Sequence, residues 1–457
     1  MLGLSADRRG RRAIPLTPVT RGAWPGLAKT LGARQQRWAQ SSGFEGQAGG
    51  FCLLPDAQGG TARVVCGIDG SSPPFALGGL PYRLPANDYR LDGDALAPQA
   101  AALGWALGSY RFTKYRKPRT EPARLLLPRR VLDDVEPTVD AITRVRDLVN
   151  TSAQDLGPAE VCSAVREIAD RHGAKCREWS GEGLLKAGFP TVHAVGRASA
   201  RAPRVIEMRW GDPKHPLLAL VGKGVCFDTG GLDLKTHDGM RWMKKDMGGA
   251  AHALALAQLV MASNLPVRLL LVIPTVDNAV GGDAMRPGDV IRTRAGITVE
   301  VDNTDAEGRL ILCDALALAV EDKPDLLIDF ATLTGAARVA LGPDLPAVFA
   351  NRDDVAGELL AAADAQHDPV WRLPLWQPYR AMLVSSIADT CNTGASRHAG
   401  AITAALYLQH FVPASVPWLH VDVYAWNDGE RPGRPRGGDA QSLRAFHAFL
   451  QRRYARG

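Results

Sequence analysis

Apolar runs alternate with longer segments of helical periodicity from about residue 160 onward. Continuous runs of branched and aliphatic residues are typical of buried strands, and they occur at residues 215–221, 266–273, 297–301 and 326–330. Helices are expected between them, at residues 249–263 and 307–321. Because buried parallel strands read as nearly continuous apolar runs, this alternation predicts an α/β domain with a mostly parallel central sheet covered by helices.

The first 130 residues have a different composition. They are rich in Gly, Pro and Arg and contain short apolar segments such as residues 62–66. Strands between turns produce this pattern, so a small N-terminal α/β domain is expected. A chain of 457 residues is also too long for one ordinary core. The predicted division is an N-terminal variable domain at 1–135 and a larger domain at 136–457. Periodicity over 135–153 predicts a helix there, and residues 136–160 are taken as the connection.

Composition is that of a globular protein, with 46% hydrophobic and 22% charged residues. No apolar run approaches the roughly 18 residues of a membrane span, so no membrane association is expected. The N-terminus has arginines but no continuous apolar core, which argues against a secretory signal; an Arg-rich transit peptide and a misassigned start codon stay open. Seven scattered cysteines without a Cys-x-x-Cys pair favour reduced thiols and a cytoplasmic location.

Charge is distributed unevenly along the chain. Residues 1–130 hold 19 Lys and Arg against 8 Asp and Glu, whereas the remainder holds 35 against 40. Clustered cations attract nucleic acid, so DNA binding by the N-terminal part is an alternative function. The sequence contains no DNA-binding motif that supports it, and a merely solvated basic face is the favoured explanation of the charge.

The first candidate segment for chemistry follows a predicted strand and presents Lys223, Asp228 and Lys235 among glycines. Glycines let the backbone approach a ligand closely. A nucleotide-binding loop is the competing interpretation, but neither the Gly-x4-Gly-Lys-Ser/Thr nor the Gly-x-Gly-x-x-Gly spacing is present.

Two further segments place acids where helices begin. Asp246 precedes two glycines that open an alanine-rich helix, and taken alone a helix cap is its favoured interpretation. Asp305 and Glu307 lie between a predicted strand and the next helix, with Arg309 close behind. The helix macrodipole favours one acid in the first turn, but it does not explain two acids beside an arginine.

Together these carboxylates offer enough oxygen atoms for two divalent cations about 3.5–4 Å apart, which polarise a carbonyl and activate water. An oxygen-rich set by itself suggests Mg²⁺ or Mn²⁺ rather than Zn²⁺. Lys223 can join it only as the neutral amine. Other hydrolytic motifs, His-Glu-x-x-His and Gly-x-Ser-x-Gly, are absent from the sequence. We expect His252 to be a packed or surface residue, and Cys226 and Cys313 to be inert core thiols.

Five motifs occur in a fixed order: Val-Gly-Lys-Gly-Val-Cys-Phe-Asp-Thr-Gly-Gly at 221–231, Lys-Asp-Met-Gly-Gly-Ala at 245–250, Asn-Thr-Asp-Ala-Glu-Gly-Arg-Leu at 303–310, Ala-Thr-Leu-Thr-Gly-Ala at 331–336 and Ala-Gly-Ala-Ile-Thr-Ala-Ala at 399–405. In them the chain resembles the leucyl (cytosol) aminopeptidase family. The resemblance runs from about residue 146 to the C-terminus, and the first 130 residues share only size and position.

The resemblance implies a two-domain metallopeptidase that assembles as a homo-hexamer of two stacked trimers. One metal would be held by Lys223, Asp228, Asp246 and Glu307, and the other by Asp228, Asp305 and Glu307. The family uses Zn²⁺, Mn²⁺ or Mg²⁺. A lysine ligand in the family answers the difficulty with Lys223, because the metal keeps its amine deprotonated.

The implied reaction removes the N-terminal residue of peptides that carry a free α-amine, with leucine or other apolar residues preferred. A metal-bridging hydroxide attacks the scissile carbonyl, which a metal and Lys235 polarise. A bicarbonate held by Arg309 shuttles the proton, since an arginine does not deprotonate near neutral pH.

Two positions depart from the family pattern. Lys245 adds a positive charge directly before Asp246, and Tyr424-Ala425 stands where the family usually has a small residue and glycine. If Tyr424 lines the substrate pocket, it narrows or reshapes that pocket; the other expected lining residues are Met243, Thr332, Leu333 and Gly335. A catalytically dead scaffold is disfavoured because the metal-binding and catalytic set is complete.

Overall fold

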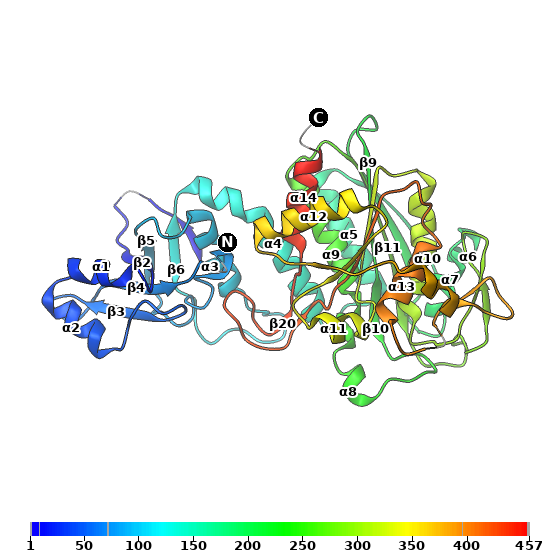
Figure 1. Cartoon of the computed structure of the whole chain (residues 1–457), viewed down its shortest axis with the longest axis horizontal. Coiled ribbons are helices and arrows are strands. Elements are labelled where there is room, and N and C mark those ends of the chain that lie inside the picture. The colour runs from blue at the N-terminus through cyan, green and yellow to red at the C-terminus, as the bar shows by residue number, and fades with distance from the viewer. Residues whose placement is uncertain (1, 9, 71–72, 395, 455–457) are drawn as a thin grey trace. The chain divides into compact units, whose positions relative to one another are not determined.

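The computed structural model describes residues 2–8, 10–70, 73–394 and 396–454. The chain forms two compact units, shown in Figure 1. Unit 1 comprises Met1–Thr143 and Asn427–Gly437, and unit 2 comprises Arg144–Trp426 and Gly438–Gly457. The division falls within helix α4 (Arg129–Asn150), and the short strands β19 (Trp426–Asn427) and β20 (Gly437–Gly438) bracket the late segment of unit 1.

Unit 1 is a small α/β domain, as predicted. Its described residues form a six-stranded sheet in the order β1-β6-β5-β2-β4-β3, parallel except where β3 meets β4. The buried Trp105 packs near Tyr89 in its core. The strands are β1 (Leu4–Ala6), β2 (Ile14–Thr20), β3 (Phe51–Pro55), β4 (Thr61–Ile68), β5 (Asp88–Leu91) and β6 (Arg124–Leu127). The helices are α1 (Trp24–Thr30), α2 (Ala33–Ser41) and α3 (Pro98–Ser109).

Unit 2 is built on a sheet to which its described residues contribute nine strands. Their order is β16-β15-β18-β14-β9-β11-β8-β7, with β10 paired to β11 as well. The centre is parallel, and antiparallel pairs occur at β15 with β18, β8 with β11 and β7 with β8. The strands are β7 (Lys175–Ser180), β8 (Arg204–Trp210), β9 (Leu217–Gly222), β10 (Gly224–Asp228), β11 (Arg268–Asn278), β14 (Leu326–Ala331), β15 (Ala347–Ala350), β16 (Trp371–Arg372) and β18 (Trp418–Asp422).

Helices cover both faces of this sheet (Figure 1). Helices α5, α9, α12 and α14 lie on one side, and α7, α10 and α13 lie on the other. The predicted mostly parallel, helix-covered sheet is therefore confirmed. The helices are α5 (Pro158–His172), α6 (Gly183–Lys186), α7 (Pro190–Gly196), α8 (His237–Met240), α9 (Gly248–Ala262), α10 (Glu307–Glu321), α11 (Gly335–Leu341), α12 (Asp353–Gln366), α13 (Gly400–Gln409) and α14 (Leu443–Tyr454).

One predicted strand lies outside the main sheet. Residues 297–301 contain β13 (Thr298–Glu300), which pairs with β12 (Val290–Arg292) and β17 (Thr390–Cys391) in a separate three-stranded sheet of the described residues. Of its three residues, Val299 alone is fully buried. The prediction that this run is a buried strand of the central sheet is wrong, because a short strand with one buried face does not need cover on both sides. The helix expected over 135–153 is α4, which begins earlier and ends at Asn150.

Candidate metal centre

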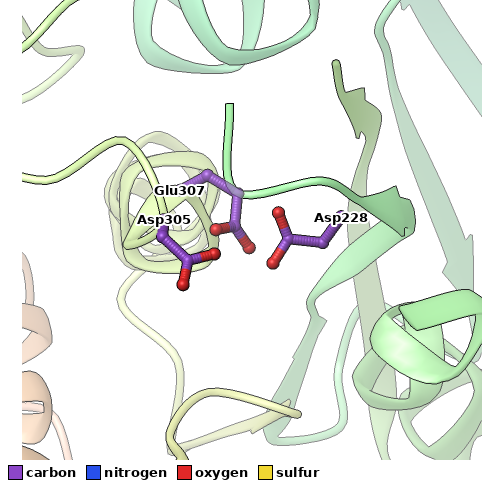
Figure 2. Close-up of side chains that lie close together, drawn as sticks. All are labelled: Asp228, Asp305 and Glu307. Carbon is purple, nitrogen blue, oxygen red and sulfur yellow. The ribbon is translucent and has the colours of Figure 1, made fainter. Parts of the chain in front are cut away.

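Three carboxylates from two separate segments converge at the C-terminal edge of the main sheet. Asp228 is the last residue of β10, Asp305 lies in the turn before α10, and Glu307 is the first residue of that helix. Figure 2 shows the three side chains pointing toward one another. One oxygen from each lies within 4.8 Å of the others, which is a spacing that one or two metal ions can bridge.

A fourth carboxylate and a lysine complete the cluster. Lys223 follows β9, and its Nζ lies 2.8 Å from Asp246 Oδ2 and 3.0 Å from Glu307 Oε1, while it donates to the carbonyl of Thr332 at 2.9 Å. Asp246 lies in a 3₁₀ turn at Met243–Met247. The N-cap of α9 is Met247, so the interpretation of Asp246 as a cap is wrong.

Lys235 reaches the cluster from the loop after β10. Its Nζ lies 2.9 Å from Asp228 Oδ2 and pairs with Asp305. The two lysines therefore meet four carboxylates, which when ionised leave two negative charges uncompensated. That excess charge is the electrostatic setting in which divalent cations bind.

Two of the acids in this cluster, Glu307 and Asp305, are poorly compensated by the protein itself. Burial raises the pKa of Glu307 well above its ordinary value, and Asp228 adds to the effect. Burial and Asp228 likewise raise the pKa of Asp305 to about 6. Burial would lower the pKa of Lys223, but Asp246, Glu307 and Asp228 hold it above its ordinary value. Each group is thus shifted by neighbours of the same small cluster.

The buried oxygen Oε2 of Glu307 has no hydrogen-bond partner among the described residues. A buried carboxylate oxygen without a donor is costly unless a cation compensates it. The oxygen-rich donor set, its excess negative charge and this oxygen together fit divalent metal ions.

Supporting residues that the sequence analysis missed hold the carboxylates in place. Asn278, at the end of β11, donates to Asp228 Oδ1 at 2.8 Å and to the carbonyl of Thr304 at 3.1 Å. Thr304 in turn donates to the carbonyl of Gly230 at 2.7 Å. Asn278 belongs to no motif and lies beyond the predicted strand at 266–273, so the sequence carried no signal for it; the structure places it beside Asp228 in register.

Arg309 lies in the first turn of α10, two residues after Glu307. It does not line the cavity that opens beside Asp228, Asp246 and Asp305. Its guanidinium is buried and donates to the carbonyl of Asn392 at 2.5 Å. Burial lowers the pKa of Arg309 from its ordinary value. The Asn392 side chain accepts from the amide of Asp302 and donates to the carbonyl of Asn303, so it also holds the turn before Asp305.

A cavity of about 400 Å³ opens beside the cluster. Lys223, Asp228, Lys235, Asp246 and Asp305 lie on its wall. The five residues predicted for the substrate pocket line it as well: Met243, Thr332, Leu333, Gly335 and Tyr424. The structure therefore brings the expected pocket into one space with Lys223, Asp228, Asp246 and Asp305, whereas Glu307 does not line this cavity.

Tyr424 contacts two cations in this cavity. The Nζ of Lys245 is 4.8 Å from the centre of its ring, and the guanidinium carbon of Arg338 is 4.9 Å from the same point. Burial lowers the pKa of Lys245 to about 8, although Asp246 opposes the change. The next residue, Ala425, has a left-handed φ of 56°, which explains why glycine suits this position.

Residues expected to be bystanders are packed in the interior. His252 is buried, with Nδ1 2.7 Å from the carbonyl of Gly248 and Nε2 accepting from the amide of Gln441 at 3.0 Å. Both ring nitrogens are therefore occupied, and His252 is not a metal ligand. Cys226 and Cys313 are free and buried, and burial raises the pKa of both thiols. They are inert core residues, as predicted.

Comparisons with known proteins show the family to which the chain is similar. Residues 143–446 match the family model described as "Cytosol aminopeptidase family, catalytic domain", and residues 14–128 match "M17 aminopeptidase, N-terminal domain". A probable cytosol aminopeptidase of Syntrophotalea carbinolica is 40% identical over 374 residues, 78% of this chain and 75% of that protein.

Solved structures extend the likeness over nearly the whole chain. The crystal structure of a cytosol aminopeptidase from Coxiella burnetii has a TM-score of 0.95 and 48% identity, covering 99% of both chains. The bottromycin maturation enzyme BotP in complex with Mn has a TM-score of 0.87 and 34% identity, covering 96% of this chain and 99% of that one.

The fold and the carboxylate cluster thus define a metal-dependent hydrolase of peptide bonds. More particularly, the chain belongs to the cytosol aminopeptidase family, and its activity is that of an aminopeptidase. None of the helices in the described ranges is long and apolar enough to cross a membrane.

Proposed function

We propose that this aminopeptidase works with two divalent ions held by five residues of the cluster. Lys223, Asp228, Asp246 and Glu307 would hold one ion, and Asp228, Asp305 and Glu307 the other. The observation that carries the proposal is the convergence of the buried Asp228 and Glu307 with the half-buried Asp305, above all the unpartnered oxygen of Glu307. Zn²⁺ and Mn²⁺ are the leading candidates and Mg²⁺ a third; the Mn complex of BotP supports Mn²⁺.

Lys223 can serve as a ligand only after it loses its proton. In the structure its ammonium is held by Asp246, Glu307 and the carbonyl of Thr332. A cation placed among the same carboxylates repels the ammonium and favours the neutral amine. Metal binding at this site should therefore release a proton.

Divalent ions held by these residues would supply polarisation of the scissile carbonyl and activation of a water molecule as the nucleophile. Lys235 then has the role of stabilising negative charge on the carbonyl oxygen, since its ammonium lines the cavity beside Asp228 and Asp305. Arg309 would hold an anion such as bicarbonate that moves the proton. Its guanidinium cannot act as a base itself.

The substrate is a peptide with a free α-amine. Met243 and Leu333 provide an apolar part of the cavity wall, which suits leucine and other apolar N-terminal residues. We place the protein in the cytoplasm as a homo-hexamer of two trimers, in keeping with the resemblance drawn from its motifs.

The test uses leucine p-nitroanilide, its N-acetylated counterpart and metal analysis of the purified protein. Hydrolysis of the free-amine substrate should be abolished by chelation and restored by Zn²⁺ or Mn²⁺, and the acetylated substrate should stay intact. Asp305→Asn should lose most activity and bound metal, whereas the exposed control Asp354→Asn should lose neither. Activity that survives both chelation and Asp305→Asn would overturn the proposal.

A further inference from the structure

The cavity wall carries two cations that the metal centre does not use. Lys245 and Arg338 both line the cavity, and they lie on the ring of Tyr424 at 4.8 and 4.9 Å from its centre. Both distances are within the range of a cation–π contact. Two positive charges therefore lie beside Tyr424, on the part of the cavity wall that we expect to form the substrate pocket.

Neither cation forms an ion pair with a described carboxylate, although Asp246 and Asp422 attract Lys245 from a greater distance. Among the described residues, no carboxylate lies within ion-pair distance of Lys245 or Arg338. Asp422 also lines the cavity. Its oxygens already accept from the amides of Leu333 and Thr334 and from the hydroxyl of Thr334, at 2.6–3.2 Å.

Asp246, the acid beside Lys245 in sequence, points to a different partner. Its Oδ2 lies 2.8 Å from the Nζ of Lys223, and its Oδ1 accepts from the hydroxyl of Thr332 at 2.8 Å. The two acids near these cations thus have other partners: Asp246 contacts Lys223 and Thr332, and Asp422 accepts from main-chain amides. Beside Tyr424 the wall therefore offers a substrate side chain two cations, Lys245 and Arg338, with Asp422 nearby and hydrogen-bonded to main-chain amides.

We propose that the pocket selects N-terminal residues by charge: it takes an acidic side chain, glutamate or aspartate, in addition to apolar ones, and rejects lysine and arginine. This inference rests on the proposed aminopeptidase function. A substrate carboxylate gains charge-assisted contacts with Lys245 and Arg338, whereas a cationic side chain meets like charges in a confined space. Repulsion of the wrong residue contributes to selectivity as much as attraction of the right one.

The decisive comparison is between glutamyl and glutaminyl p-nitroanilides, because the two side chains have nearly the same shape and differ in charge. We expect kcat/KM to be about tenfold higher for the glutamyl substrate, the effect of one well-placed charge contact near a surface. The lysyl substrate should fall below the glutaminyl one by a similar factor. Equal values for the glutamyl and glutaminyl substrates would overturn the inference.

Leucine p-nitroanilide separates this inference from the function on which it rests. Hydrolysis of leucine without discrimination between glutamate and glutamine leaves the aminopeptidase function standing and removes the charge selection. Failure to hydrolyse any of these substrates with metal supplied removes both.

Variants of Arg338 test the wall directly, because this residue is exposed and its replacement should not disturb folding. Arg338→Gln should lower the ratio of glutamyl to glutaminyl kcat/KM severalfold, and Arg338→Glu should invert it and raise the lysyl rate. The exposed Arg352, outside the cavity, provides the matched control Arg352→Gln, which should leave the ratio unchanged. An unchanged ratio in Arg338→Glu contradicts the inference.

Discussion

The side chain of Lys223 occupies the space in which a side chain on Gly308 would stand. A Cβ built on Gly308 would lie 2.6 Å from the Nζ of Lys223. This glycine, the second residue of α10, directly follows Glu307, so helix and lysine approach at the centre of the cluster. Glycine is required here for room and not for its backbone conformation.

Gly308→Ala should therefore displace Lys223 from Asp246 and Glu307 and lower kcat/KM at least tenfold, with weaker metal binding. Alanine favours a helix interior by roughly 1 kcal/mol over glycine, so the loss should appear in activity more than in stability. Steady-state kinetics and metal titration measure it. The control is Gly357→Ala in α12, where a Cβ meets nothing within 4 Å; a normal Gly308→Ala enzyme would show that the position of Lys223 is unimportant.

Asn278→Asp should weaken metal binding by roughly 10- to 100-fold, the usual effect of losing a partner that orients a ligand. The change replaces the donor to Asp228 Oδ1 by an acceptor and adds a charge next to the cluster. Titration of the metal-free protein with Zn²⁺ or Mn²⁺ measures the effect. Asn351→Asp, outside the cavity, serves as the comparison, and equal affinities in the two variants would count against a supporting role for Asn278.

Ala425→Gly should stabilise the protein by roughly 0.5–1 kcal/mol, because alanine at a φ of 56° is strained and glycine is not. Ala425 is buried, so the lost packing of its methyl group reduces the gain. The midpoint of denaturant unfolding is the measurement. A lower midpoint than that of the parent would mean that packing of the methyl group outweighs the strain.

Because of Asp314, the free energy of unfolding should fall as the pH rises from about 4 to 6. Burial raises the pKa of this carboxyl to about 6 although it accepts from the amides of Thr191 and Arg294. Since the folded-state pKa lies above the unfolded value, its contribution is fully present below pH 4 and is lost as the pH rises through 6.

Asp314→Asn does not titrate, so the stability of this variant relative to the parent should rise by about 2 kcal/mol between pH 4 and pH 7. The comparison of unfolding midpoints across pH cancels the constant cost of the lost hydrogen bond. A pH-independent difference would show that Asp314 has an ordinary pKa.

Local periodicity was enough to predict the helices that carry the site. The predicted range 307–321 coincides with α10, and 249–263 differs from α9 by one residue at each end, because long apolar helices that start at glycines or acids have strong local signals. The short strand β13 was misplaced, since an apolar run of five residues does not reveal which sheet it joins.

The cluster was predictable in composition but not in its supports. Asn278, Arg338 and Asp422 act through contacts with residues 50 to 90 positions away, as in the bond from Asn278 to Asp228 or from Leu333 to Asp422. When the sheet brings two distant residues together, the sequence around each of them contains no pattern that predicts the contact. Geometry alone identified them.

The late segment Asn427–Gly437 has a consequence for the order in which the protein is made. This segment contributes to unit 1, where Glu430 lies 3.6 Å from Arg111. At about 5–20 residues per second, a ribosome needs on the order of 15 to 60 s to proceed from residue 143 to residue 437. The unit that leaves the ribosome first must therefore wait, unfinished, until nearly all of unit 2 has been synthesised.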